Sequence, residues 1–365
     1  MTTSESPAAG KDFGIDEYLR KRLLPVEGAI PHLPRTNMYG NSIPAGSVGG
    51  DLFEYINFQQ RYSIDRRITR AFELSKEYLQ PLADGQIPRI MVDEHVRWLQ
   101  SRSNPSDVTE AEYRKSKSSE RLRVAENLET LYTTAGVLFV DAQGHEIMSA
   151  KIASTVHDTF HALMLTELDR HGKTTPELFE NINLRLAQSV TARNALGLDA
   201  NDHSREIATM IYGEICPDGR FRFVNFGSPP PLVFSAEFGC FVPMNTDQLV
   251  QFPALGLEIP EDNPDRNKYY SLALRQRQIN SSDVGQIKLM SPGDIIFLYS
   301  DGVYDGSDQQ ARTALEGVVR DHKHRPAKDI CNAILAYALE QDDYFKRIGE
   351  RDRIDDKTAF IIKHG

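Results

Sequence analysis

The chain has 365 residues, a formal net charge of −10 at pH 7, 40% hydrophobic residues and 26% charged residues. These values are ordinary for a globular protein that buries a full core, and the negative charge argues against nucleic acid as a partner. The three cysteines are widely spaced, which excludes a zinc ribbon or a disulfide framework. No apolar run reaches the roughly 18 residues of a membrane span, and the polar N-terminus lacks a hydrophobic signal core. We therefore expect a cytoplasmic protein with no membrane partner and a flexible tail over residues 1–13.

The first third of the chain predicts a helix, a strand and then a helical insertion. Residues 15–25 have the pattern of a short helix, and a segment rich in proline and glycine leads into a strand near 52–58. Residues 59–130 are rich in Arg, Glu, Lys and Gln, with apolar residues at helical spacing and breaks at Pro81, Pro88 and Pro105. We interpret residues 14–365 as one domain that this insertion interrupts. Its apolar stripe needs a partner, so we favour a contact with a regulatory protein or a homodimer, with Trp98 as a candidate contact residue, over a solvated helical excursion.

From residue 131 onward, strands occur in runs with paired helices between them. Strand patterns cover 135–142, 206–216, 220–226, 231–235, 293–302 and 357–364. Helical patterns cover 149–172, 175–192, 308–322 and 326–341, and residues 243–286 are loop-like with short strands. This order favours an α+β layered sandwich over a doubly wound parallel sheet.

Four aspartate positions share one kind of location, the point where an apolar strand meets a loop. Asp51 follows Gly49-Gly50, Asp141 ends "VLFVD", Asp301 ends "IIFLYSD", and the pair Asp355-Asp356 precedes "KTAFII". Each aspartate alone is a common turn or capping residue. Together, carboxylates at neighbouring strand ends repel one another unless a hard cation neutralises them, and an all-oxygen ligand set suits Mg²⁺ or Mn²⁺. A pair of such ions can activate water for in-line attack on phosphorus.

Five sequence blocks in this order resemble a known family. "PAGSVGGDLFEY", "VLFVDAQGHEIMSA", "IATMIYGEICPDGRFRFVNFGSPPPLVF", "PGDIIFLYSDGVYDG" and "IDDKTAFIIK" are similar to the SpoIIE-type, RsbU-like branch of the metal-dependent PPM serine/threonine phosphatases. The resemblance implies an α-β-β-α layered β-sandwich, two Mn²⁺ or Mg²⁺ ions, and hydrolysis of phosphoserine or phosphothreonine in a protein substrate. It also implies the metal ligands, which are Asp51, Asp141, the carbonyl of Ala142, Asp301 and Asp355. Asp356 resembles a position where the family often has Asn, so it is the weaker candidate of its pair.

Three features depart from the family pattern. Gly144-His145-Glu146 stands where the family has Gly-His-Gly, and Phe226-Gly227-Ser228 stands where it has Ala-Gly-His. The third departure is the helical insertion, where the family has a tight pair of strands. His145 lies four residues beyond Asp141, and its unperturbed pKa of about 6.5 suits a catalytic general acid, although a loop histidine is the alternative.

Two rival sites have weaker support. His157 and His161 in "HDTFH" have the spacing of a zinc-protease motif, but Asp158 replaces its glutamate and no third ligand follows, so histidines on a partly buried helix face explain the pair better. A serine hydrolase is less favoured still, because "FGSPPP" lacks the Gly-x-Ser-x-Gly elbow.

Two functions follow from these patterns. The first is a phosphoprotein phosphatase in which Asp51 and Asp141 hold the metal that activates water, and the resemblance implies a substrate such as a phosphorylated anti-sigma-factor antagonist. The second is a non-enzymatic regulator that keeps the fold and binds a partner through its insertion. The presence of all the proposed ligands favours the enzyme.

Overall fold

The computed structural model describes residues 30–80, 110–143, 146–195, 207–244, 251–257, 284–306 and 308–365. Several sequence predictions lie outside these residues, namely the flexible tail, the helix at 15–25, the helix breaks at Pro81, Pro88 and Pro105, the contact at Trp98 and the role of His145.

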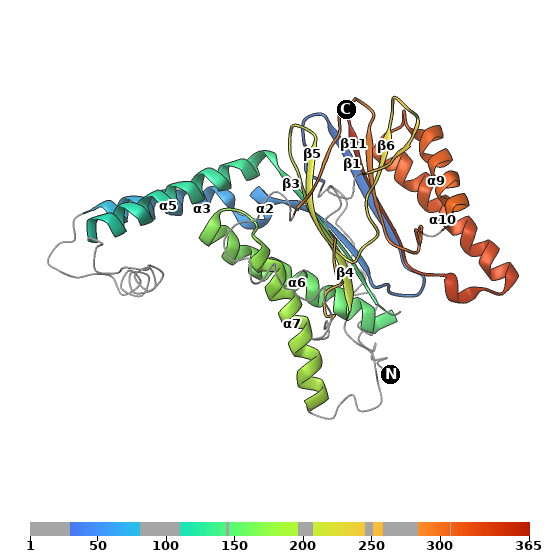
Figure 1. Ribbon diagram of the computed structural model, residues 1–365, viewed down its shortest axis with the longest axis horizontal. Helices are drawn as coiled ribbons and strands as arrows, with labels where there is room; N and C mark the ends of the chain where they lie inside the picture. Colours follow the sequence, from blue (N-terminus) through green and yellow to red (C-terminus); the bar gives the residue numbers. More distant parts are fainter. Residues whose placement is uncertain are drawn as a thin grey trace, which may run out of the picture.

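Two β-sheets form the centre of the molecule (Figure 1). Sheet A has the order β1-β11-β10-β6-β7 and comprises Thr36–Ile43, Lys357–His364, Ile295–Tyr299, Leu232–Ser235 and Cys240–Val242. Sheet B has the order β2-β3-β4-β5-β8, with β9 also paired to β5, and comprises Asp51–Asn57, Ala135–Ala142, Ala208–Ile215, Arg220–Phe226, Gln251–Phe252 and Gly285–Lys288. The pairings are antiparallel except for β5 with β8.

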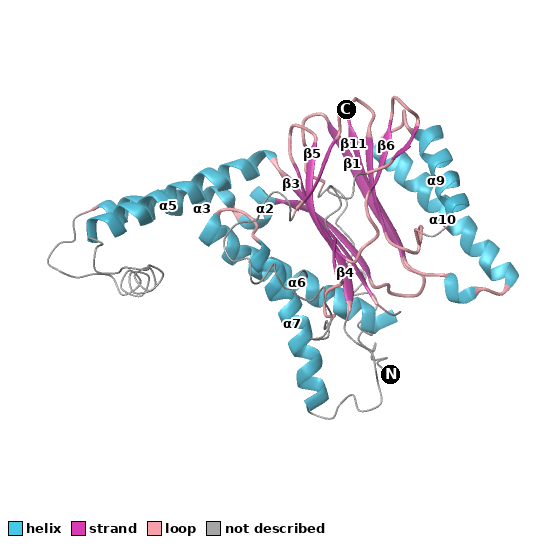
Figure 2. Cartoon of the chain, in the orientation of Figure 1, coloured by secondary structure: helices cyan, strands magenta, loops and turns pink. Residues whose placement is uncertain are grey.

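Helices cover the outer face of each sheet, as Figure 2 shows. Helices α9 (Gln309–His322) and α10 (Ala327–Ile348) pack on sheet A, and helices α6 (Glu146–His171) and α7 (Pro176–Ala195) pack on sheet B. A third apolar cluster fills the space between the sheets. Because the central strand β10 is covered on both faces, all five of its residues are apolar and buried. These layers confirm the predicted α+β sandwich.

Strand β1 is one element that the sequence patterns miss. Its residues "TNMYGNSI" include Gly40 and two asparagines, and the preceding prolines favour a loop interpretation. The strand forms because it completes the edge of sheet A, where all eight of its residues are in register with β11. Tertiary pairing therefore overrides a weak local preference.

Helices leave the sandwich between β2 and β3 (Figure 1). They are α2 (Phe58–Tyr62), α3 (Ile64–Leu79) and α5 (Glu110–Thr130), followed by a short 3-10 turn at Leu131–Thr133. Helices α3 and α5 lie side by side, with Ser75 and Ser118 in hydrogen-bond contact at 2.8 Å and the rings of Tyr78 and Tyr113 packed edge to face. The base of α5 is tied to α6, because Asn127 donates to the carbonyl of His171 at 2.8 Å. Across the described ranges, no helix is both long enough and apolar enough to pass through a lipid bilayer.

Candidate metal centre

The centre is built on the antiparallel pair β2 and β3. Their register places Asp51 directly opposite Asp141 at the end of the strands. Both aspartates are positioned by apolar strand residues beside them. Leu52 and Phe53 after Asp51, and the "VLFV" run before Asp141, are buried. Two acidic residues are thus held in adjacent backbone positions by the burial of their apolar neighbours.

The environment of this pair disfavours charge. Burial raises the pKa of Asp141 to about 9, and the nearby Asp51, Asp301, Asp355 and Asp356 raise it further toward that value. Burial also raises the pKa of Asp51 to about 7, against the opposing effect of the Thr358 hydroxyl, which donates to Asp51 Oδ2 at 2.6 Å. A metal-free centre therefore retains protons at neutral pH. Only a cation, or bound protons, can neutralise this many carboxyl groups.

Asp301 and Asp355 approach the pair from sheet A. Asp301 follows β10, and partial desolvation together with Asp355 raises its pKa. Asp355 is half-buried and lies two residues before the start of β11. Strands β10 and β11 are neighbours, so their adjoining ends deliver the two carboxylates to the same edge of the sandwich. The structure thus brings together all four aspartates that the sequence singles out as candidate ligands.

Asp356 has a different environment. Its two carboxylate oxygens accept hydrogen bonds from the backbone amides of Ala45 at 2.7 Å and Gly50 at 2.6 Å. Any side chain at position 49 would collide with this carboxylate, because a Cβ at Gly49 would lie 2.5 Å from Asp356 Oδ2. Asp356 therefore fixes the loop between β1 and β2, whereas the Asp355 carboxylate accepts a hydrogen bond from the backbone amide of Asp356 at 2.8 Å.

The carbonyl of Ala142 lies over Gly50. A Cβ at Gly50 would lie 2.5 Å from this oxygen and 2.8 Å from Ser149 Cβ. The backbone in this place is also held by the Ala142 amide, which donates to the Gly50 carbonyl at 3.2 Å. Glycine is thus required by close approach, and any larger residue would displace the candidate carbonyl ligand.

Replacing Gly50 by Ala should destabilise the protein by about 1–3 kcal/mol, because the added methyl group has no space. It should also weaken the thermal stabilisation that Mn²⁺ confers, since the Ala142 carbonyl must move. Melting curves with Mn²⁺ and with EDTA measure both effects. Gly46→Ala is the matched control from the same loop, where the nearest atom to an added Cβ is 3.8 Å away. Equal behaviour of the two variants would contradict the proposed crowding.

Two further sequence candidates can be placed. His145 lies outside the described residues, so its catalytic role remains a prediction. Ser228 is fully buried, and its backbone is closed into a turn by Asn225, whose side-chain oxygen accepts from the Ser228 amide at 2.9 Å. A substrate cannot reach this serine, so the structure gives no support to a serine hydrolase.

The histidine pair of "HDTFH" contacts a residue that the sequence patterns miss. Glu54 projects from β2 to α6, and its Oε2 lies 2.9 Å from His157 Nε2 and 2.6 Å from His161 Nε2. The histidines are partly buried on a helix face, as expected. Glu54 lies 103 residues before His157, so no local motif could have revealed it.

Comparisons with known proteins give one family match and several structural neighbours. A family model described as Stage II sporulation protein E (SpoIIE) matches residues 133–365, which is more than half of the chain. No curated protein sequence matches. Among solved structures, the RsbU and RsbW domains of a Mycobacterium tuberculosis protein are 15% identical, with a TM-score of 0.46, over 93% of this chain and 63% of that chain.

Two other solved structures match the chain at low identity. The SiaA-PP2C domain of Pseudomonas aeruginosa is 12% identical, with a TM-score of 0.44, over 90% of this chain and 85% of that chain. The phosphatase domain of SpoIIE from Bacillus subtilis, solved with a fragment of its regulatory domain, is 14% identical, with a TM-score of 0.39, over 63% of this chain and 54% of that chain. The present chain thus spans less than two thirds of the mycobacterial and the Bacillus structures.

The match over residues 133–365 includes the segments that carry Asp141, Asp301 and Asp355. The order of the sequence blocks, the two-sheet sandwich and the grouping of aspartates at its edge agree with that match. The chain therefore belongs to the SpoIIE family, the branch of the metal-dependent PPM serine/threonine phosphatases that its motifs resemble.

Proposed function

We propose that this protein hydrolyses phosphoserine or phosphothreonine in a protein substrate, using Mn²⁺ or Mg²⁺ bound at the aspartate centre. The observation that carries the proposal is the cross-strand pair of Asp51 and Asp141, whose pKa values are raised by burial and by further carboxylates. The donor set consists of oxygen atoms alone, which suits a hard divalent cation.

We propose that the centre holds two ions, because a pair of ions about 3.5–4 Å apart can activate a water and neutralise the charge of the phosphoryl group together. The residues proposed to hold them are Asp51, Asp141, Asp301, Asp355 and, through its carbonyl, Ala142.

Bound divalent cations lower the pKa of coordinated water and neutralise phosphoryl charge. The chain itself supplies orientation. Thr358 donates a hydrogen bond to Asp51, and the amide of Thr358 donates to the Ser300 hydroxyl at 2.9 Å, which links the strand before Asp301 to the strand after Asp355. These bonds hold the carboxylates so that they need not rearrange when the substrate binds.

A cleft of about 280 Å³ opens beside Asp301 and Asp355. Helix α10 and the loop after β10 form its walls, and among the described residues that line it Arg353 is the only Lys or Arg. The guanidinium of Arg353 packs over the ring of Phe345, 4.3 Å from its centroid. We propose that the phosphorylated segment of the substrate enters here and that Arg353 attracts its phosphate group.

Turnover of p-nitrophenyl phosphate and of a phosphoserine peptide by the purified full-length protein tests the proposal. Activity should require Mn²⁺ or Mg²⁺ and should disappear in EDTA. Arg353→Ala should raise the KM for the phosphopeptide by about tenfold, since an uncompensated phosphate contact is lost, whereas the exposed Arg351, which does not line the cleft, should tolerate Ala. A folded protein that shows no turnover with either metal, or full turnover in EDTA, would refute the phosphatase assignment.

For the substrate we propose a small phosphorylated regulator such as an anti-sigma-factor antagonist. Membership of the SpoIIE family supports this choice. Dephosphorylation of such a protein, measured beside an unrelated phosphoserine peptide of equal length, should be faster by at least about tenfold if surface contacts outside the phosphate contribute. Equal rates would argue against a dedicated partner.

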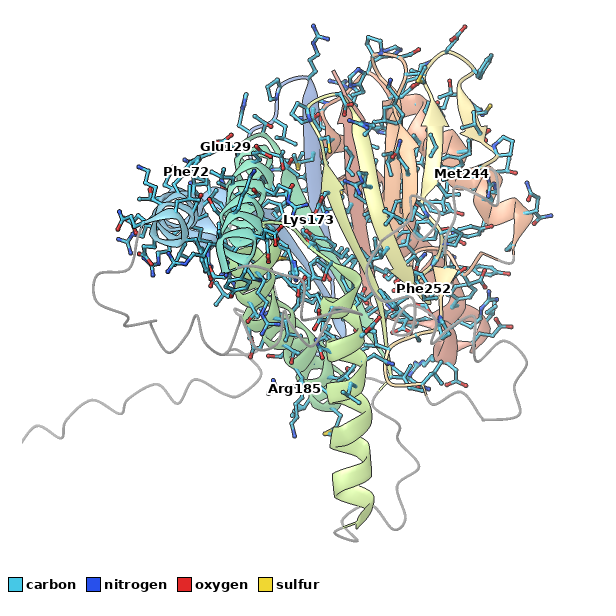
Figure 3. The ribbon with its side chains drawn as sticks, turned by 60° about the vertical axis from the view of Figure 1, so that its left-hand side comes forward. Phe72, Glu129, Lys173, Arg185, Met244 and Phe252 are labelled. Atoms are coloured by element: carbon cyan, nitrogen blue, oxygen red, sulfur yellow. The ribbon has the colours of Figure 1, made fainter. Side chains whose placement is uncertain are left out.

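We further propose that the pair of helices α3 and α5 contacts another protein, a second copy of this chain being the simplest. Phe72 is 38% exposed and Leu79 is 61% exposed, and their spacing of seven residues places them on one face of α3. Figure 3 shows Phe72 on this helix pair, away from the sheets. Light scattering of the full-length protein should give a dimer that Phe72→Ser and Leu79→Ser weaken. A wild-type monomer at all concentrations would exclude the homodimer.

A further inference from the structure

Glu54, His157 and His161 form a cluster on the outer face of sheet B, separate from the aspartate centre. Side chains alternate along β2, so Glu54 faces the layer of α6, whereas Asp51 points to the opposite face. The two histidines are four residues apart on α6 and therefore share one side of that helix. Their side chains and that of Glu54 are between 11% and 19% exposed, so the cluster is shielded from solvent but reachable.

The ring nitrogens of His157 both face carboxylate oxygens. Nε2 lies 2.9 Å from Glu54 Oε2, and Nδ1 lies 3.2 Å from Asp158 Oδ1. A carboxylate only accepts hydrogen bonds, and a neutral imidazole has one N–H. With a neutral ring, one of the two nitrogens therefore faces a carboxylate oxygen without a hydrogen between them. A second proton on the ring, or a cation between Nε2 and Glu54, would remove this repulsion.

Glu54 is ionised in this arrangement. Burial alone would raise its pKa, but the hydrogen bonds from His157 and His161 lower it to about 2. The second histidine is neutral, because burial lowers the pKa of His161 against the opposing effect of Glu54. In the other tautomer of His161, with the proton on Nδ1, its Nε2 and the Glu54 carboxylate present electron pairs to the same small volume.

Each histidine also has an oxygen partner for its other nitrogen. His157 Nδ1 has Asp158, and His161 Nδ1 lies 2.6 Å from the hydroxyl of Tyr62. Histidines that bind a metal through Nε2 nearly always donate Nδ1–H to such a partner, which fixes the tautomer and orients the ring. The hydroxyl of Tyr62 can accept that bond as readily as it can donate one.

From this geometry we infer that Glu54, His157 and His161 form a second metal site, for a zinc-class transition cation, with a fourth position open to solvent. Two imidazoles and one carboxylate are a common set of three zinc ligands, and imidazole favours Zn²⁺, Co²⁺, Ni²⁺ or Cu²⁺ over the Mg²⁺ or Mn²⁺ that suit the aspartates. Around an ion with bonds of about 2.0–2.1 Å, tetrahedral ligands lie about 3.3 Å apart. The Glu54 carboxylate must therefore withdraw by a few tenths of an ångström, which a change of its side-chain torsions provides.

A cation in this place would fasten α6 to β2. When the cation binds, the proton of His161 moves from Nε2 to Nδ1, and the Nδ1–H then donates a hydrogen bond to the Tyr62 hydroxyl. A proton on His157 Nε2 is released to solvent. The site requires no change in the backbone and does not depend on the phosphatase activity.

The test is a titration of the full-length Asp141→Asn protein with Zn²⁺, in which the aspartate centre is impaired. We expect saturable binding of one Zn²⁺, and the Co²⁺-loaded protein should have the visible absorption of a four-coordinate site with nitrogen ligands. His157→Gln in the same background should weaken binding by about 100-fold or more, and Tyr62→Phe by about tenfold, since loss of an outer partner costs about 10- to 100-fold. His171→Gln, which changes another histidine of α6, is the matched control and should bind as the parent does.

Three outcomes would overturn the inference. The first is the absence of saturable Zn²⁺ binding by the folded Asp141→Asn protein. The second is Zn²⁺ binding that is unchanged in Tyr62→Phe and in His157→Gln. The third is loss of Zn²⁺ binding in His171→Gln, because His171 belongs to a separate group with Glu167 and Glu177. Tyr62→Phe and the Co²⁺ spectrum keep the test decisive if His157→Gln does not fold.

Discussion

Asp141→Asn is expected to abolish metal-dependent turnover while it stabilises the metal-free protein. The activity should fall by at least about 10²-fold, because the residue belongs to the proposed ligand set and its charge positions the reacting groups. The stability of the metal-free form should rise, because the substitution removes a carboxyl group whose charged state the fold disfavours. The two effects have opposite signs, which distinguishes a ligand from a residue that merely supports the fold.

The sign of the stability change depends on pH. The pKa of Asp141 is 3.8 in the unfolded chain and about 9 in the fold, so the carboxyl group costs stability above pH 4 and the cost grows until about pH 9. Each unit of difference corresponds to about 1.4 kcal/mol. Melting curves in EDTA should therefore show little difference between wild type and variant at pH 4 and a clear gain of stability for the variant at pH 8. Asp218→Asn, in the exposed turn between β4 and β5, should leave activity unchanged and give no gain of stability, because hydrogen bonds from Arg220 outweigh the slight desolvation of Asp218 and lower its pKa. A loss of stability in Asp141→Asn at pH 8 would contradict the electrostatic account.

Metal affinity should rise steeply with pH. The pKa of Asp51 is about 7 and that of Asp141 about 9 in the metal-free fold, so a binding cation must displace at least one proton, and near pH 6 closer to two. Affinity then increases by about tenfold per pH unit for each proton released. Between pH 6 and pH 8, the Kd for Mn²⁺ should fall by about 100-fold or more.

Calorimetry in buffers of different ionisation enthalpy counts the protons directly. The control is Asp141→Asn, in which the residual binding should release about one proton fewer than in the wild type. Binding that is independent of pH would mean that the carboxylates are already ionised in the metal-free protein. In that case the raised pKa values of the buried carboxyl groups would not explain why the centre binds a cation.

Much of the fold could be predicted from the sequence, and the reason is physical. The runs "VLFV" and "IIFLY" are apolar on both faces because both faces of the sandwich are covered, and such runs predict strands without any knowledge of the partner. The aspartates could be singled out because a charged carboxylate at the end of a buried strand loses hydration, which destabilises the fold unless a cation or a hydrogen-bond donor compensates.

Other features depend on contacts between distant residues. Strand β1 has little strand preference of its own and is fixed by β11, which lies more than 300 residues later. Asp355 and Asp356 are adjacent residues of the same type. The hydrogen bonds from the amides of Ala45 and Gly50 show that Asp356 stabilises the loop between β1 and β2. In the same way, Glu54 has no motif that links it to the helix on which His157 and His161 lie.

The hydrogen bonds of Asp356 to the loop between β1 and β2 affect how the two sheets are held relative to each other. The candidate ligands come from both sheets, with Asp51 and Asp141 in sheet B and Asp301 and Asp355 beside strands of sheet A. Face-to-face layers can slide over one another, because the apolar contacts between them have no preferred direction. Asp356 belongs to the end of sheet A and holds the amide of Gly50 next to the first residue of sheet B. Asp356 therefore ties the two sheets together at the edge where the two halves of the ligand set meet.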